Sequence, residues 1–492
     1  MPLTLSWSAP AAAAPVISNV AAADITATSA RISWTLDMPA TGQVNYGPTA
    51  SYGSSTTAES SYAYSAHAQA ITGLSPSTTY HYRVRSTNIG AQETVSGDFT
   101  FTTLASTGTR PETMDPLTYV PLVSGTMPTY LGTYADALYG TTITRVSNST
   151  QRRHVYASIP AWNSDETLLN LGYAAGGVRA MLNGSTYAQL QGDQSNTGTL
   201  FWSHLVATKA WCQNGNNNGY RRLSVNTTTG VVSVAATFAA ASISRPGGGV
   251  YSAFAVGGVD GGIQGVQSDD DQYVAFLWKA SSNDWGIGVL DLSTDTVHAE
   301  RTMGTSASSI GALMDNCGMS HTGGWAWFVF VADGSGAAQG MWLYETDLNT
   351  TTRVQASTSQ EHCDWAMTGA GADRFVYWAG NATSMDPATG TKTVLQTPIP
   401  GGTHISGRAK DFPGWVLISQ HEPGYTNPGG NAIFALSIDN PGEAKVWCHN
   451  HRTASVGYAG EVHASPNWDM TRVVFAVNWE GDSNVYAHVV EV

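Results

Sequence analysis

Short runs of alternating apolar and polar residues, separated by turn residues, fill the first part of the chain. The stretch TTYHYRVRS has the period of two that places one face of a β-strand against a core. Tyr80, Tyr82 and Val84 fall on that face, and Trp34 lies in an earlier alternating strand. Leu74 precedes the segment SPSTTY, which is typical of a tyrosine corner. This region therefore predicts a two-sheet β-sandwich.

Sheet-like units with a spacing of roughly forty to sixty residues recur through the rest of the chain. Several open with a small residue, polar residues and an apolar strand, as in IPAWNSDETLLNLGY and ASPNWDMTRVVFAVNW. Seven such units predict a seven-bladed β-propeller, in which the sheets are arranged radially about one axis. The inner strands are expected to begin near His154, Trp202, Ile263, Cys317, His362, His404 and Glu461.

An isolated strand, YGTTITRVSN from Tyr139, precedes the first complete unit. We expect it to supply the outer strand of the last blade, whose own strands run to Val492. This pairing would close the ring and remove the exposed sheet edges of an open stack.

The composition favours an all-β protein and argues against some functional classes. The 492 residues are 42% apolar and only 12% charged, with abundant Gly, as expected for strands joined by tight turns. The formal net charge of -14 argues against a duplex nucleic-acid binder, because such proteins need a basic face. No apolar stretch approaches the length of a membrane span.

The start of the chain, MPLTLSWSAPAAAAP, lacks the basic region and long apolar run of a signal peptide. The scarcity of lysine and the many Ser, Thr and Asn residues nevertheless favour a secreted or extracellular protein, with a virion surface as the alternative. The cysteines show no CxxC pairing, so a zinc ribbon or thioredoxin site is not expected. Free buried thiols and disulfides are both compatible with Cys212, Cys317, Cys363 and Cys448.

The predicted organisation has four parts: a tail over 1–14, a sandwich over 15–104, a polar, Pro-containing linker over 105–129 and a propeller over 130–492. The sandwich resembles a fibronectin type III domain over its whole length, and LSPSTTYHYRV is the stretch that carries the resemblance. Such modules usually act as spacers or adhesion units. Its sequence contains no cluster of acids, bases or ligand residues.

Four segments in the second half of the chain place a histidine shortly before an aromatic strand. They read GMSHTGGWAWFVF, EHCDWAMTGAGADRFVYW, GTHISGRAKDFPGWVLIS and EVHASPNWDMTRVVFAVNW, and contain His321, His362, His404 and His463. Equivalent positions of successive propeller blades face the same axis, so these imidazoles are expected to meet there.

The last two units resemble a known family. GTHISGRAKDFPGWVLIS and KVWCHNHRTASVGYAGEVHASPNWDMTRVVFAVNW are similar to the end of the propeller polysaccharide lyases of the oligogalacturonate lyase type. In that family a divalent cation on the propeller axis, commonly manganese, helps to bind the substrate carboxylate. The resemblance implies a divalent cation, Mn or Ca, held by His404, Glu461 and His463, with Glu461 in place of a family histidine.

The resemblance also implies the other roles of a lyase site. His362 matches the histidine that abstracts the substrate proton. The catalytic arginine of the family is missing, because the comparable strand reads GAAQGMWLY. Arg408 or Arg452 is expected to hold the carboxylate instead.

Further side chains are candidates for the same site. A neutral His or a Tyr can act as the base, so Tyr458 is a second catalytic candidate, while His421 and His451 are expected to contact substrate. Trp365 is a candidate for stacking on a sugar ring. Each histidine also has a structural alternative, since an imidazole at a strand start can bond to neighbouring backbone or carboxylates, and for His321 the structural role is favoured.

The sequence thus predicts a secreted two-domain protein that binds an acidic polysaccharide and cleaves a uronate-containing polymer by metal-assisted β-elimination. The alternative is a non-catalytic carbohydrate-binding or structural protein of a cell surface or virion. The missing family arginine and the adhesive character of fibronectin type III modules support this alternative.

Overall fold

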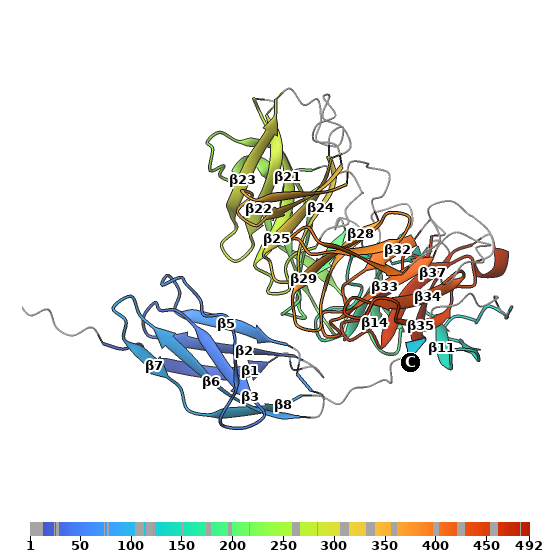
Figure 1. Cartoon of the computed structure of the whole chain (residues 1–492), viewed down its shortest axis with the longest axis horizontal. Helices are drawn as coiled ribbons and strands as arrows, with labels where there is room; N and C mark the ends of the chain where they lie inside the picture. The colour runs from blue at the N-terminus through green and yellow to red at the C-terminus, as the bar shows by residue number, and fades with distance from the viewer. Residues whose placement is uncertain are drawn as a thin grey trace, which may run out of the picture. The chain divides into compact units, whose positions relative to one another are not determined.

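The computed structural model consists of two compact units, Met1–Ser106 and Thr107–Val492 (Figure 1). Its described residues are mostly in β-strands, with short 3-10 turns at Ala240–Ser242 (η1) and Trp479–Gly481 (η3). The all-β fold class expected from the sequence is confirmed. The structure describes residues 13–23, 25, 29–72, 74–75, 78–103, 113–114, 122, 124–148, 152–154, 156–173, 179–194, 199–215, 217–257, 266–282, 284–305, 314–330, 340–355, 362–396, 403–420, 429–452, 461–482 and 484–492.

Two antiparallel sheets form the first unit. One contains β1 (Ile17–Ala23), β2 (Ala30–Leu36) and β5 (Ala66–Ile71), and the other contains β3 (Gln43–Gly47), β4 (Ser54–Ser55), β6 (Thr79–Thr87), β7 (Glu93–Val95) and β8 (Phe99–Thr102). Alternate residues of β6, including Tyr80 and Tyr82, are buried as the sequence pattern predicted. The hydroxyl oxygen of Tyr80 accepts a hydrogen bond from the amide of Ser75 at 2.9 Å, which confirms the tyrosine corner.

The described residues of the second unit form seven antiparallel sheets, the architecture of a seven-bladed β-propeller. We number the blades in the order of their inner strands. Blade 1 contains β12 (Arg152–Arg153), β13 (Leu168–Tyr173), β14 (Arg179–Asn183) and β15 (Gln189–Gln194). Blade 2 contains β16 (Leu200–Trp202), β17 (Lys209–Gln213), β18 (Tyr220–Val225) and β19 (Val232–Phe238). Blade 3 contains β20 (Tyr251–Val256), β21 (Tyr273–Ala280), β22 (Trp285–Asp291) and β23 (Thr296–Gly304).

The remaining blades follow in chain order, and the last one takes strands from both ends of the unit. Blade 4 contains β24 (Met314–Met319), β25 (Trp325–Phe330), β26 (Gly340–Glu345) and β27 (Thr351–Gln355), and blade 5 contains β28 (Cys363–Met367), β29 (Asp373–Trp378), β30 (Ala382–Met385) and β31 (Lys392–Gln396). Blade 6 contains β32 (Thr403–Ser406), β33 (Trp415–Gln420), β34 (Ala432–Ser437), β35 (Ala444–His449) and β9 (Thr113–Met114). Blade 7 contains β36 (Ser465–Pro466), β37 (Arg472–Val477), β38 (Tyr486–Glu491), β11 (Thr141–Arg145) and β10 (Thr133–Asp136).

The ring closes as the sequence predicted. Strand β11 pairs antiparallel with β38, so that Ile143 lies opposite Val490. Both side chains are fully buried. Because β11 precedes blade 1 in the chain and β38 is the last strand of the chain, this pairing ties the two ends of the propeller together.

Two expected boundaries differ from the structure. Strand β9, at Thr113–Met114, pairs with β35 of blade 6, although it lies within the segment 105–129 that was expected to be a linker. Its pairing uses backbone groups, and a two-residue strand in a polar, Pro-containing segment leaves no periodic signal. The third sheet begins at β20, earlier than Ile263, which lies outside the described residues.

The four cysteines are free and buried. Burial raises the pKa of the Cys317 and Cys448 thiols, so these side chains behave as small apolar groups of the core. In the described ranges no helix has the length and apolar character needed to cross a bilayer.

Candidate metal centre

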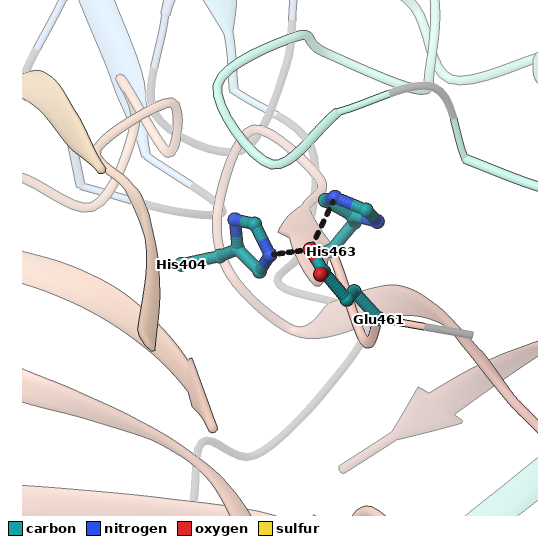
Figure 2. A group of neighbouring side chains, drawn as sticks. All are labelled: His404, Glu461 and His463. Carbon is teal, nitrogen blue, oxygen red and sulfur yellow. Dashed lines mark hydrogen bonds and ion pairs between the residues drawn. The ribbon is translucent and has the colours of Figure 1, made fainter. Parts of the chain in front are cut away.

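Three side chains predicted as metal ligands, His404, Glu461 and His463, converge beside the inner strands of blades 6 and 7 (Figure 2). His404 is in β32, and the other two lie in the segment that leads into β36. The Nε2 atom of His404 is 3.0 Å from the Oε2 atom of Glu461, and the Nε2 atom of His463 is 3.6 Å from the same oxygen. One ligand atom of each residue lies within 4.8 Å of the others.

The donor set fits a transition-metal ion. Both histidine side chains are 0% exposed, and the Glu461 side chain is 18% exposed. Two imidazole nitrogens and one carboxylate oxygen suit manganese and similar ions, whereas calcium takes oxygen ligands. Of the two expected cations, this donor set therefore fits manganese better than calcium.

Hydrogen bonds from neighbouring blades hold the segment that carries His463. The amide of Ala464 donates to the Ser419 hydroxyl at 3.1 Å, and the Ser465 hydroxyl donates to the Ile159 carbonyl at 3.0 Å. His463 itself has a φ of 30°, in the left-handed region that non-glycine residues rarely adopt and that is enriched at functional sites. His451 also has a positive φ, so the converging side chains, and not the backbone alone, mark the centre.

The half-buried ring of His362, expected to be the base, lies next to the centre. It immediately precedes β28 of blade 5, and its centroid is 4.3 Å from that of His404. The structure therefore brings together His362 and the three candidate ligands, as expected for inner-strand positions that face one axis.

Tyr156 of blade 1 is a residue that sequence reasoning missed. Its ring stands edge-on to His404 at 5.4 Å between centroids and lies 5.2 Å from the ring of His463. The segment HVYASIP resembles the later blade openings in placing a histidine and an aromatic residue together. That signal could have identified it, because the closed ring makes blade 1 the neighbour of blade 7.

Arg408 does not have the role expected for it. Its guanidinium donates to both carboxylate oxygens of Asp364, with 3.0 Å between Nε and Oδ2, and both side chains are 1% exposed. Burial raises the pKa of Asp364 and the Arg408 charge opposes that shift. Arg408 is therefore committed to an internal ion pair, and the expectation that it holds a substrate carboxylate is corrected.

Two expected substrate contacts are also corrected. Trp365 is 0% exposed and packs edge-on against Phe375 at 5.2 Å in the core, so no sugar ring can stack on it. His451 is buried, its Nδ1 lies 3.1 Å from Glu480, and its ring stacks on Trp479 at 3.9 Å. Both side chains have chemistry suited to substrate contact, but they point into packed interfaces, which the sequence does not show.

The remaining candidates are only partly located. Arg452 is buried immediately after His451, and its amide donates to the Asn450 side chain at 3.0 Å. His421 and Tyr458 lie outside the described residues.

The fourth recurrent histidine, His321, is part of a buried polar group. Its Nδ1 lies 2.8 Å from Asp269, and its Nε2 lies 3.2 Å from the carbonyl oxygen of Trp365. Burial lowers the pKa of His321, but the Asp269 carboxylate outweighs this effect and the pKa is raised. These contacts agree with the structural role favoured for this residue.

Comparisons with known proteins address the fold. The family model described as purple acid phosphatase, N-terminal domain, matches residues 15–103, which form the fibronectin-III-like sandwich. A search of curated proteins gives no match. The sensor domain of the anti-sigma factor RsgI4 from Pseudobacteroides cellulosolvens is 28% identical over 20% of this chain and 97% of that chain, with a TM-score of 0.17.

A solved protein from Lactobacillus plantarum is also similar, at 12% identity over 69% of this chain and 99% of that chain, with a TM-score of 0.32. These TM-scores are too low to carry an argument, so the propeller architecture rests on the strand pairing itself. The resemblance to polysaccharide lyases is not tested by these comparisons and stays a prediction.

Proposed function

We propose that the propeller binds a divalent cation through His404, Glu461 and His463 and uses this centre to recognise and cleave a uronate-containing polysaccharide. The observation that carries the proposal is the convergence of these side chains next to the ring of His362. A metal-ligand set beside a further imidazole has the parts that elimination next to a carboxylate requires.

The charge at the centre makes recognition of an acidic polymer depend on the cation. The chain has a formal net charge of -14, and Glu461 adds a carboxylate at the centre itself. A polyanion approaching these groups would be repelled. A bound divalent ion reverses the local sign and neutralises the carboxylate of a uronate residue, which makes the neighbouring proton more acidic.

His362 is the proposed general base. In its neutral form it takes the proton from the carbon next to the uronate carboxylate. The electron pair of that C–H bond forms a carbon–carbon double bond, the glycosidic C–O bond breaks, and the departing oxygen takes up a proton. The products are an unsaturated uronate and a new chain end.

Two further features belong to the proposal. Arg452 is the other arginine expected to hold a carboxylate, and it takes this role in the proposal because Arg408 is paired with Asp364. The sandwich would act as a spacer or adhesion module of a secreted or extracellular protein.

The experiment is incubation of the full chain with a panel of uronate polymers in the presence of Mn²⁺, followed by ultraviolet absorbance of the unsaturated product. We expect product with the wild-type chain and a loss of at least about 100-fold with His362→Ala, the usual effect of removing a general base. His298→Ala is the matched control, because His298 is exposed on the outer strand β23. Absence of product across the panel would contradict the enzymatic proposal.

A second candidate function is binding without cleavage. The commitment of Arg408 to Asp364 favours it, because one of the two arginines expected to replace the missing family arginine is taken up by an internal ion pair. In this case a non-catalytic protein of a cell surface or virion would bind the polymer through the same cation. Mn²⁺-dependent retention on an immobilised uronate polymer, without an unsaturated product, would identify this function.

A further inference from the structure

A buried ion pair joins β28, which His362 immediately precedes, to the end of β32, which carries His404. Asp364 is in β28, two residues after His362, while Arg408 follows the end of β32. The Arg408 Nε atom is 3.0 Å from Asp364 Oδ2, and Nη2 bonds to Asp364 Oδ1, so the pair is bidentate. With both side chains 1% exposed, water does not compete for these bonds.

The backbones of blades 5 and 6 meet at the same place. The amide of Gly407 donates to Asp364 Oδ2 at 2.9 Å, and the amide of Trp365 donates to Oδ1 at 2.8 Å. A Cβ atom added to Gly407 would lie 1.8 Å from the Trp365 carbonyl oxygen, so only glycine permits this approach. The ion pair and the glycine together fix the distance between β28 and β32.

The ion pair is one end of a polar chain that runs through blades 2 to 6. The Trp365 carbonyl contacts His321 of blade 4, His321 contacts Asp269 of blade 3, and the Nδ1 atom of His204 in blade 2 lies 3.1 Å from Asp269. Both histidine side chains are 1% exposed. Burial raises the pKa of Asp269, but the two histidines outweigh it and hold the pKa well below its ordinary range. The carboxylate thus stays ionised between them.

We propose that Asp364 and Arg408 are positioning residues that set the spacing between His362 and His404. This inference rests on the proposed cation site. A buried ion pair adds little stability compared with apolar residues of similar volume. We therefore expect this pair to fix the relative position of the two strands more than it stabilises the fold. The bidentate geometry fixes both the separation and the rotation of the two strands. His404 lies on one of them, and His362 directly precedes the other.

The test uses the full chain with the double substitution Asp364→Leu/Arg408→Met, which keeps the volume of the pair and removes its hydrogen bonds. Isothermal titration with Mn²⁺ gives the affinity, and calorimetric unfolding gives the Tm. We expect an affinity about 10- to 100-fold weaker, the usual effect of losing groups that orient metal ligands. We also expect a lower Tm, because the buried amides of Gly407 and Trp365 lose their acceptor.

The matched control is Arg245→Met/Glu300→Leu, which removes a pair whose side chains are each 9% exposed and whose carboxylate is on the outer strand β23. We expect this variant to bind Mn²⁺ like wild type. Should the first double variant also bind like wild type, the Asp364–Arg408 pair has no positioning role.

Two further measurements test the inference in case the double variant misfolds or the wild-type chain binds no cation. Arg408→Lys keeps the charge but not the bidentate geometry, and we expect the same loss of affinity with the fold retained. If the wild-type chain binds no Mn²⁺, the proposed cation site is wrong. The positioning role of the ion pair is then tested by the imidazole NMR signals of the metal-free proteins. Signals of His362 and His404 that move in Arg408→Lys but not in the control support positioning, and unchanged signals overturn it.

Discussion

The Nε2 atom of His404 lies 3.0 Å from the Oε2 atom of Glu461, although 57 residues separate them in the chain. One residue is in the inner strand of blade 6 and the other precedes the inner strand of blade 7. The radial arrangement of the blades brings them to a common axis and adds His463 to the group.

Removing one ligand should remove the cation. We expect His404→Ala and His463→Ala to weaken Mn²⁺ binding by at least about tenfold, because each leaves only two protein ligands. Metal analysis of the purified chain and titration calorimetry measure the effect.

Chelation should lower the Tm of the wild-type propeller, since a ligand at 100 times its Kd stabilises the folded state by about 2.7 kcal/mol. His298→Ala should behave like wild type, and a chelator-insensitive Tm would argue against a bound ion.

The ring of Tyr156 should hold the two imidazoles in place through packing. Tyr156→Phe keeps the ring that contacts His404 and His463, whereas Tyr156→Ala removes it from a site that is 5% exposed. We expect the Ala variant to lose about 3–5 kcal/mol of stability and to bind Mn²⁺ more weakly than the Phe variant. Equal affinities for the two variants would show that the ring does not position the ligands.

Ring closure by β11 should be visible in the unfolding of the propeller. Ile143 is 0% exposed and lies on the strand that pairs with β38, so we expect Ile143→Ala to cost about 2–5 kcal/mol. Ile71→Ala is the matched control, because Ile71 is 1% exposed in the sandwich. In scanning calorimetry the first substitution should shift the propeller transition and the second the sandwich transition. A shift of the same transition by both would contradict this assignment.

Mild acid should destabilise the last blade through His488. Burial against Phe475 and Trp479 lowers the pKa of His488 to about 3, and the nearby charge of Arg145 acts in the same direction, while a bond to the Tyr486 carbonyl opposes it. In the unfolded chain the pKa is about 6.5, so the unfolded state binds more protons below that pH.

The stability that comes from the neutral His488 is therefore complete above about pH 6.5 and is lost as the pH falls towards 3, by about 1.4 kcal/mol per pH unit. His488→Phe should flatten this part of the dependence of Tm on pH. His298→Phe should leave it unchanged. An identical slope for His488→Phe and wild type would show that another group controls the acid limb.

The tertiary arrangement explains why the sequence predicted some site residues and missed others. The recurring blade openings predicted that His404 and His463 would meet on the axis, and the resemblance to the lyase family implied Glu461 as the third ligand. Tyr156 was missed because predicting ring closure does not show which side chain of blade 1 lies against His463. Arg408 was placed wrongly because the sequence does not show that Asp364 faces it across two strands.

The sequence by itself determined the two units, the all-β class and the closing strand, because strand period, turn residues and repeat spacing are local properties of the chain. The tertiary structure alone decided which polar side chains meet. Trp365 and Arg408 have the chemistry of a sugar-binding site, yet one lies in the core and the other in a buried ion pair. The physical reason is that burial and partners depend on how neighbouring blades pack, and residues from distant parts of the chain set that packing.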